Sequence, residues 1–154
     1  MSDKKDEKRF YIAYGSNLSV EQMAVRCPDA RIAGMAALKD WKLSFKVHAT
    51  IEPCKGRAVP VLVWEISEKD ERNLDVYEGF PSYYFKKDME ITVTDLDGND
   101  PKRLTAMVYI MDERHGLRRP MRGYYEVLKE GYERFGFNPY ILELALREVE
   151  EGER

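Results

Sequence analysis

The chain has 154 residues, of which 44% are apolar and 34% charged, and its formal net charge is −3. This length suits one domain that buries its own core, and the balanced charge argues against a broad nucleic-acid-binding surface. No apolar stretch is long enough for a membrane helix and none reads as a signal segment, so we expect a cytoplasmic protein with neither a membrane nor a nucleic-acid partner.

The residue types give little support for metal or redox chemistry. Cys27 and Cys54 have neither metal-binding nor redox spacing, and two histidines are too few for a histidine-based metal centre. We therefore expect reduced thiols, no metal and no cofactor.

The N-terminal region is predicted to be a tail that leads into a strand. Residues 1–8 are nearly all charged or polar, which is typical of a solvated tail and leaves one domain over residues 9–154. A strand is expected from about Arg9 to Tyr14. A helix is expected over residues 20–26, with Ser19 as its cap and Pro28 just beyond its end.

The five residues Tyr14-Gly15-Ser16-Asn17-Leu18 must turn the chain from this strand into this helix. Gly15 permits either a positive φ or a close approach of backbones. Successive N–H groups in such a turn can converge on an anion or an oxyanion. The local sequence by itself favours a plain capped turn, so the binding interpretation needs further support.

The next segment is expected to contain strands separated by a loop. Residues 30–38 fit either a short strand or a loop, and the alternation in residues 41–47 predicts a half-buried strand. Residues 48–57 contain Pro53 and Gly56 and are expected to form a loop before a buried strand at residues 59–66. His48 is interpreted as structural or solvent-facing rather than as a base, and Arg57 as either a carboxylate clamp or a solvated residue.

A helix capped by Ser67 is expected to end at Gly79, which places Glu78 in its last turn. There the negative end of the helix dipole and any burial both raise the pKa of the carboxyl, which suits general acid–base chemistry. A frayed, exposed glutamate is the plainer interpretation of this stretch alone. The surrounding apolar side chains favour burial instead: Tyr77, Phe80, Pro81, Tyr83 and Tyr84.

Two paired strands and two helices are expected to complete the chain. Residues 83–93 and 103–111 are predicted to be strands joined by a hairpin turn at residues 97–100. A loop at residues 112–119 carries three arginines that would be solvated unless one contacts an anionic substrate: Arg114, Arg118 and Arg119. Five or six strands before two closing helices predict an α+β fold with a mainly antiparallel sheet that curls toward a barrel.

Several motifs in this chain resemble the γ-glutamylcyclotransferase-like family, which includes AIG2-like proteins. They are the strand leading into residues 14–18, the run Val63-Trp64-Glu65-Ile66-Ser67, and Leu74-Asp75-Val76-Tyr77-Glu78-Gly79, followed by Pro120, Tyr124, Leu128 and Gly131. The resemblance spans Phe10 to about Tyr140, with one departure at Val61, where relatives often have glycine. It implies a small β-barrel-like sheet flanked by helices, with a pocket at one end.

The resemblance also implies site residues. Glu78 would be the catalytic acid–base residue, and the turn would hold the substrate through its backbone amides, with two tyrosines as further contacts. The implied substrate-binding set is Tyr14, Gly15, Ser16, Asn17, Leu18, Tyr84 and Tyr124. No metal ligand is implied.

The implied reaction closes the glutamyl group of a small-molecule γ-glutamyl substrate into 5-oxoproline and releases an amine. The leaving group stays open among an amino acid, the dipeptide of glutathione, the ε-amine of a lysine and a carrier-bound amine, although Asn17 argues against glutathione. A catalytically silent binding module of the same fold and a scaffold for a protein partner are the alternatives. The sequence also leaves a homodimer open.

Overall fold

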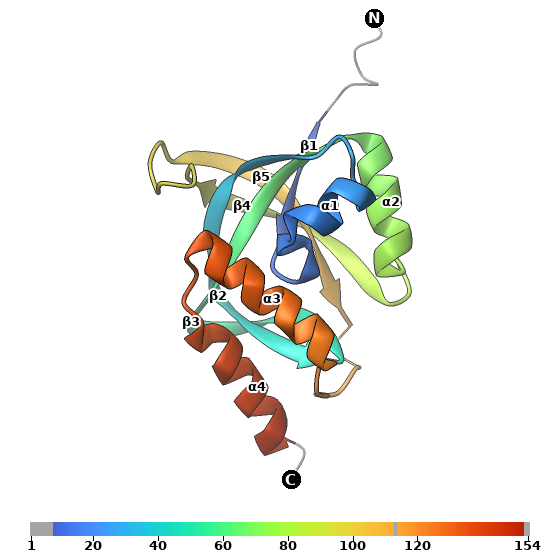
Figure 1. Ribbon diagram of the computed structural model, residues 1–154, viewed down its shortest axis with the longest axis vertical. Helices are drawn as coiled ribbons and strands as arrows, with labels where there is room; N and C mark the ends of the chain where they lie inside the picture. The colour runs from blue at the N-terminus through green and yellow to red at the C-terminus, as the bar shows by residue number, and fades with distance from the viewer. Residues whose placement is uncertain (1–7, 113, 153–154) are drawn as a thin grey trace, which may run out of the picture.

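The computed structural model describes residues 8–112 and 114–152, so almost all of the tail predicted at residues 1–8 lies outside the described residues. A short 3₁₀ helix, Ser16–Leu18, follows the first strand. The remaining elements, shown in Figure 1, are β1 (Arg9–Ala13), α1 (Val20–Arg26), β2 (Arg31–Lys46), β3 (His48–Ile66), α2 (Glu68–Glu78), β4 (Tyr84–Val93), β5 (Lys102–Met111), α3 (Arg122–Phe135) and α4 (Tyr140–Gly152).

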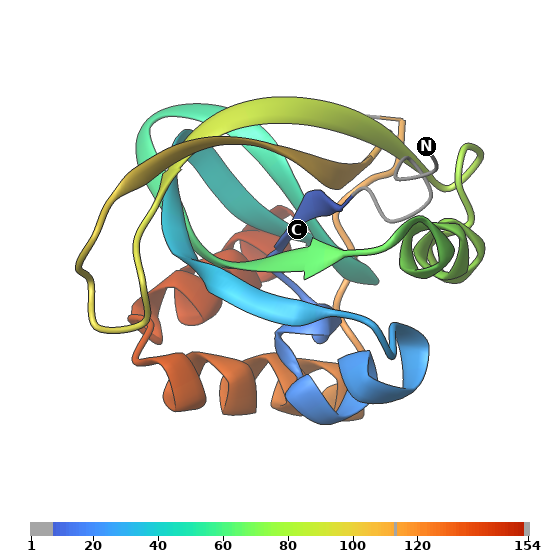
Figure 2. The same cartoon turned by 90° about the horizontal axis from the view of Figure 1, so that it is seen from above.

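The strands form one sheet in the order β2-β3-β1-β5-β4. Neighbouring strands are antiparallel except β1 and β5, which run parallel. Helices α3 and α4 pack on one side of the curled sheet, whereas α2 stands at one end of it (Figure 2). The predicted α+β fold with a mainly antiparallel sheet is confirmed.

The two outer strands approach each other at one point without closing the sheet into a barrel. Met35 of β2 and Thr94, just after β4, exchange two backbone hydrogen bonds of 2.9 Å. A Cβ atom on Gly34 would lie 2.0 Å from the carbonyl oxygen of Thr94, so this contact requires glycine. The sheet is therefore barrel-like in that it curls strongly, and the bridge between Met35 and Thr94 joins its two outer edges.

The prediction of a loop at residues 48–57 is wrong, because this segment belongs to β3 and pairs with β2 in a long hairpin. The chain reverses instead at Val47, whose φ is +72°. Four residues, 54–57, bulge out between the pairs Lys39–Ala58 and Trp41–Pro53. Proline and glycine mark this bulge, and pairing with a strand outside the segment overrides their local signal. Residues 31–38, which fitted a strand or a loop, are part of β2.

Helix α2 begins and ends as the sequence predicts. At its start, the Ser67 hydroxyl accepts a hydrogen bond of 3.1 Å from the Asp70 N–H, and the Asp70 carboxylate accepts one of 3.2 Å from the Ser67 N–H. At its end, Gly79 takes a left-handed conformation with φ of +65°. These caps make Glu78 the last helical residue.

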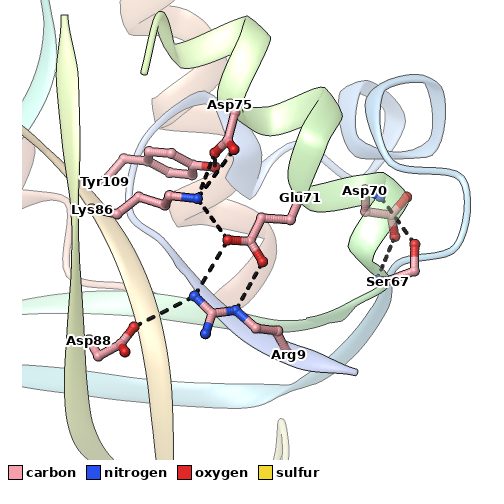
Figure 3. Close-up of polar contacts among 8 residues, drawn as sticks. All are labelled: Arg9, Ser67, Asp70, Glu71, Asp75, Lys86, Asp88 and Tyr109. Carbon is pink, nitrogen blue, oxygen red and sulfur yellow. Dashed lines mark hydrogen bonds and ion pairs between the residues drawn. The ribbon is translucent and has the colours of Figure 1, made fainter. Parts of the chain in front are cut away.

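A network of ion pairs holds α2 against the sheet (Figure 3). Lys86 of β4 lies 2.8 Å from Glu71 and 3.0 Å from Asp75, and Arg9 of β1 pairs with Glu71 at 2.9 Å. The Tyr109 hydroxyl of β5 donates a hydrogen bond of 2.6 Å to Asp75. Since three strands hold the helix through its side chains, the direction of its C-terminal end is fixed. Among the described residues, no helix combines the length and apolar character needed to cross a membrane.

Candidate active site

The glycine turn and the end of α2 meet at one cavity of about 130 Å³. Residues from most of the chain line it, from β1 near the N-terminus to α3 near the C-terminus. Seven of the eight predicted site residues are among them: Tyr14, Gly15, Ser16, Asn17, Glu78, Tyr84 and Tyr124. The curled sheet therefore brings together the two motifs that lie some sixty positions apart in the sequence.

Glu78 is the titratable carboxyl of this cavity. Burial raises its pKa from 4.5 to about 7, and the positive charge of Arg26 opposes this shift. The sequence predicted the direction of the shift, and removal from solvent is its main cause. A carboxyl with this pKa exists in both protonated and ionised forms near neutral pH, so it can accept and return a proton.

The turn at the cavity wall contains backbone N–H groups without an acceptor inside its own 3₁₀ helix. Its first intrahelical hydrogen bond runs from the Leu18 N–H to the Gly15 carbonyl, at 3.0 Å. The N–H groups of Gly15, Ser16 and Asn17 precede this bond, and the first N–H groups of a helix have no intrahelical acceptor. Gly15 has φ of −120°, so the turn does not need glycine for a positive φ. The close approach of neighbouring atoms is the reason for glycine at this position. A Cβ there would lie 3.2 Å from the Tyr124 hydroxyl.

Leu18 is the predicted site residue that does not line the cavity. Its side chain is fully buried and packs against Gly131 of α3, where a Cβ would lie 2.7 Å from that of Leu18. Its N–H is already bonded within the turn. Leu18 thus packs the turn against α3 and takes no part in the cavity lining.

Asn17 uses its side chain to hold the turn. Its Nδ2 donates a hydrogen bond of 2.8 Å to the Tyr11 hydroxyl, and its Oδ1 accepts one from Arg26. Its backbone carbonyl accepts a hydrogen bond of 3.0 Å from the indole N–H of Trp64. With both ends of the amide engaged, the residue contributes to the cavity mainly by fixing the backbone beside it.

Two of the predicted tyrosines hold the backbone of one residue of β3, Ala49, from its two sides. The Tyr84 hydroxyl donates to the Ala49 carbonyl at 2.7 Å, and the Tyr124 hydroxyl accepts from the Ala49 N–H at 2.9 Å. Tyr14 donates to the Tyr109 carbonyl at 2.6 Å. Burial raises the pKa of Tyr14, Tyr84 and Tyr124 above the ordinary tyrosine value, so these hydroxyls stay protonated and neutral.

Several lining residues were not expected as site residues, notably His48, Tyr77 and Tyr83. His48 Nδ1 lies 3.1 Å from the Tyr83 hydroxyl, and burial lowers the pKa of this histidine, which favours the neutral imidazole. The Tyr77 hydroxyl lies 3.0 Å from Ser16 Oγ. The partners of these residues come from distant segments, so no local pattern identifies them. For Tyr77, the adjacent Glu78 is the one available signal.

The arginines singled out in the sequence do not line the cavity. Arg57 pairs with Glu148 at 3.2 Å and Arg114 with Asp112 at 3.1 Å. The cation that does influence Glu78 is Arg26 of α1, whose guanidinium carbon lies 3.6 Å from the centroid of the Tyr77 ring. Nothing in the predicted helix at residues 20–26 distinguished it. Over the described ranges, no three metal-ligating side chains gather into a metal site.

Comparisons with known proteins find similar sequences and similar folds. The family model "Gamma-glutamyl cyclotransferase, AIG2-like" covers residues 11–127. The chain is 33% identical over 119 residues to the human protein named gamma-glutamylcyclotransferase, which is 69% of this chain and 61% of that one. For the bovine protein of the same name the identity is 33% over 117 residues, 68% of this chain and 60% of the relative.

A solved structure titled "Gamma-glutamyl cyclotransferase" superposes with a TM-score of 0.75 at 27% identity, covering 90% of this chain and 86% of the other. The alignments with the curated human and bovine proteins, by contrast, span only about three fifths of the length of those relatives.

Proposed function

This chain belongs to the γ-glutamyl cyclotransferase, AIG2-like family, and from that premise we propose that it converts a small γ-glutamyl amine or γ-glutamyl amino acid to 5-oxoproline and a free amine. The substrate's α-amine attacks its own γ-carbonyl, a five-membered lactam forms, and the bond to the leaving nitrogen breaks. The reaction needs no cofactor, because nucleophile and electrophile belong to one molecule. Holding the two together contributes up to about 7–11 kcal/mol.

One observation carries this proposal: Glu78, with a pKa of about 7, lines the same cavity as the donor-rich turn. In the proposed mechanism the ionised carboxylate takes a proton from the α-ammonium and so frees the amine to attack. The protonated carboxyl then donates to the leaving nitrogen. After ring closure the α-nitrogen still carries one proton more than the lactam keeps, and the carboxylate passes this second proton to the departing amine, which leaves as an ammonium. In all, two protons move from the α-nitrogen to the leaving nitrogen, and Glu78 ends in its ionised starting state.

The turn is proposed to stabilise the charge that develops on the γ-carbonyl oxygen. The N–H groups of Gly15, Ser16 and Asn17 precede the first hydrogen bond of the 3₁₀ helix and lie at the cavity wall. Loss of one such donor costs about 3–4 kcal/mol of transition-state stabilisation in comparable sites. The Tyr84 and Tyr124 hydroxyls are proposed to orient the glutamyl group, either directly or through the backbone of Ala49, whose carbonyl and N–H they bind.

The size of the cavity supports a small substrate. Its volume of about 130 Å³ is below the ~300 Å³ at which pockets for drug-sized ligands begin. We therefore place the glutamyl group inside and the leaving amine at the mouth, near His48 and Tyr83. This arrangement accommodates an amino acid, a dipeptide, the ε-amine of a lysine or a carrier-bound amine as the leaving group.

A substrate panel tests the proposal. The chain is incubated with γ-glutamyl amino acids, glutathione, ε-(γ-glutamyl)-lysine and simple γ-glutamyl amines, and 5-oxoproline is quantified. Release from at least one class supports the cyclotransferase. Binding without release, measured by calorimetry, would indicate a silent binding module instead. Absence of both across the panel would overturn the proposal.

A further inference from the structure

The guanidinium of Arg26 contacts both halves of the site from outside the cavity. Its Nη1 donates to the side-chain oxygen of Asn17 in the turn. Its carbon lies 3.6 Å from the centroid of Tyr77, the residue immediately before Glu78. Its Nη2 donates to Gln22 at 3.1 Å, which fixes the side chain against its own helix. One rigid, planar cation therefore lies between the donor-rich turn and the end of α2.

We propose that Arg26 is a positioning residue that joins the turn to the end of α2 and places its positive charge opposite Glu78. The inference rests on the proposed function, since the turn and Glu78 are the groups that it would hold in register. A planar guanidinium can stack on an aromatic ring and donate hydrogen bonds at its edge at the same time, and a lysine cannot reproduce both contacts.

The charge of Arg26 also acts on the titration of Glu78. Burial raises the pKa of Glu78, and Arg26 lowers it again by favouring the ionised form. The other polar or titratable groups around Glu78 come from β1 and the turn, β3, α2, β4 with the residue before it, β5 and α3. They are Tyr11, Tyr14, Ser16, Asn17, His48, Tyr77, Tyr83, Tyr84, Tyr109 and Tyr124. Of this set together with Arg26, only the guanidinium carries a permanent charge.

Lys86 provides a matched comparison, because it is a cation that contacts the same helix and a residue just after Glu78. Its ammonium lies 4.3 Å from the centroid of Phe80, two residues after Glu78, so it also packs on an aromatic neighbour of the carboxyl. It pairs with Glu71 and Asp75, which neutralise its charge (Figure 3). Lys86 therefore holds α2 without acting on the titration of Glu78.

The test compares Arg26→Gln, Arg26→Lys and Lys86→Met with the wild type. The titration midpoint of the Glu78 carboxyl is read from its ¹³C shift in glutamate-labelled protein, with Glu78→Gln to assign the signal. In Arg26→Gln the midpoint should rise by about one pH unit. The acidic limb of the pH profile of kcat/KM should move to higher pH with it. In Lys86→Met the melting temperature should fall while the midpoint stays at the wild-type value.

Arg26→Lys separates charge from geometry. It keeps the positive charge, so the Glu78 midpoint should stay near that of the wild type, whereas kcat/KM should fall at least tenfold because the joint to Asn17 and Tyr77 is lost. This variant also serves as the test if Arg26→Gln does not fold. Wild-type kcat/KM in Arg26→Lys would overturn the positioning role, and so would an unchanged midpoint in a folded Arg26→Gln.

The carboxyl titration separates this inference from the proposed function. It requires no substrate, so it reports the action of Arg26 on Glu78 even if no panel compound yields 5-oxoproline. Turnover by the wild type with no effect of either Arg26 variant on the midpoint or on kcat/KM would reject the role of Arg26 alone.

Discussion

The side-chain oxygens of Ser16 and Tyr77 lie 3.0 Å apart, although 61 positions separate the two residues in the chain. Ser16 belongs to the donor-rich turn, and Tyr77 immediately precedes Glu78. This hydrogen bond is thus a direct link between the two segments that form the cavity. Arg26 adds a second link through the ring of the same tyrosine.

We expect the Ser16–Tyr77 link to be measurable as a coupling energy. In a double-mutant cycle with Ser16→Ala and Tyr77→Phe, the interaction should contribute about 0.5–1.5 kcal/mol to the free energy of unfolding. Urea denaturation of the four proteins measures it. As a control, Ser16→Ala is combined with Tyr140→Phe on α4, a half-exposed tyrosine remote from the turn. That pair should be additive, and equal coupling in both cycles would contradict the link.

Replacement of Glu78 by glutamine should abolish most 5-oxoproline release. The amide keeps the shape of the carboxyl but cannot carry the proton, so we expect a loss of about 10²–10⁴-fold in kcat. Glu68→Gln removes an exposed carboxylate from the first turn of the same helix and should leave kcat within about twofold. Near-normal turnover by Glu78→Gln would remove Glu78 from the mechanism.

The raised pKa of Glu78 should make folding stability depend on pH. Between pH 4.5 and 7 the carboxyl is ionised in the unfolded chain but largely protonated in the folded one, so the folded state binds more protons and loses stability as pH rises. The loss is at most about 3 kcal/mol, and solvent at the cavity mouth reduces it. Below pH 4.5 both states are protonated and the effect vanishes.

The variant Glu78→Gln isolates this contribution. Its free energy of unfolding relative to the wild type should increase as pH rises from 4.5 to 7 and then level off. Chemical denaturation at several pH values measures the difference. The corresponding difference for Glu68→Gln should change far less over this range. A Glu78→Gln difference that stays flat or declines would show that the carboxyl is not desolvated.

Replacing each of two glycines of α3 by alanine should change the stability of the protein in opposite directions. A Cβ on Gly131 would lie 2.7 Å from the Cβ of Leu18, whereas a Cβ on Gly123 would have no neighbour within 4 Å. Gly123→Ala should therefore stabilise the helix by up to about 1 kcal/mol. Gly131→Ala should destabilise the protein by about 1–3 kcal/mol through overpacking.

Because Leu18 belongs to the turn and packs on Gly131, Gly131→Ala should displace the turn and also lower kcat/KM, whereas Gly123→Ala should not. Thermal unfolding and the 5-oxoproline assay provide the two measurements. If Gly131→Ala is as stable and as active as Gly123→Ala, the packing of α3 does not position the turn.

The elements with strong local signals agree with the structure. The caps Ser67 and Gly79 place Glu78 at the end of α2, and the capping residue Ser19 starts α1 where expected. The hairpin β2–β3 is the main exception, because Pro53 and Gly56 indicate a loop when read locally. Only the partner strand supplies the pairing that turns their segment into a bulged strand.

The residues of the site fall into the same two groups, those that the sequence indicates and those that only the fold brings in. Its motif residues are recognisable in the sequence as a turn rich in small polar residues and as a carboxyl at a helix end. The roles of Leu18 and Arg26 are not, since one packs on α3 and the other contacts a ring in α2. His48 lines the cavity because β3 passes beside Tyr83 and Tyr124, which lie far away in sequence.

The sequence by itself determined the α+β class, most element boundaries, the family resemblance and the two motifs, because capping, periodicity and turn chemistry act within a few residues. Only the tertiary structure decided that those motifs share one cavity, that Glu78 is desolvated enough for a pKa of about 7, and that the charge of Arg26 acts on it. Burial and electrostatic fields depend on distances between segments that are remote in the chain, and the fold alone sets those distances.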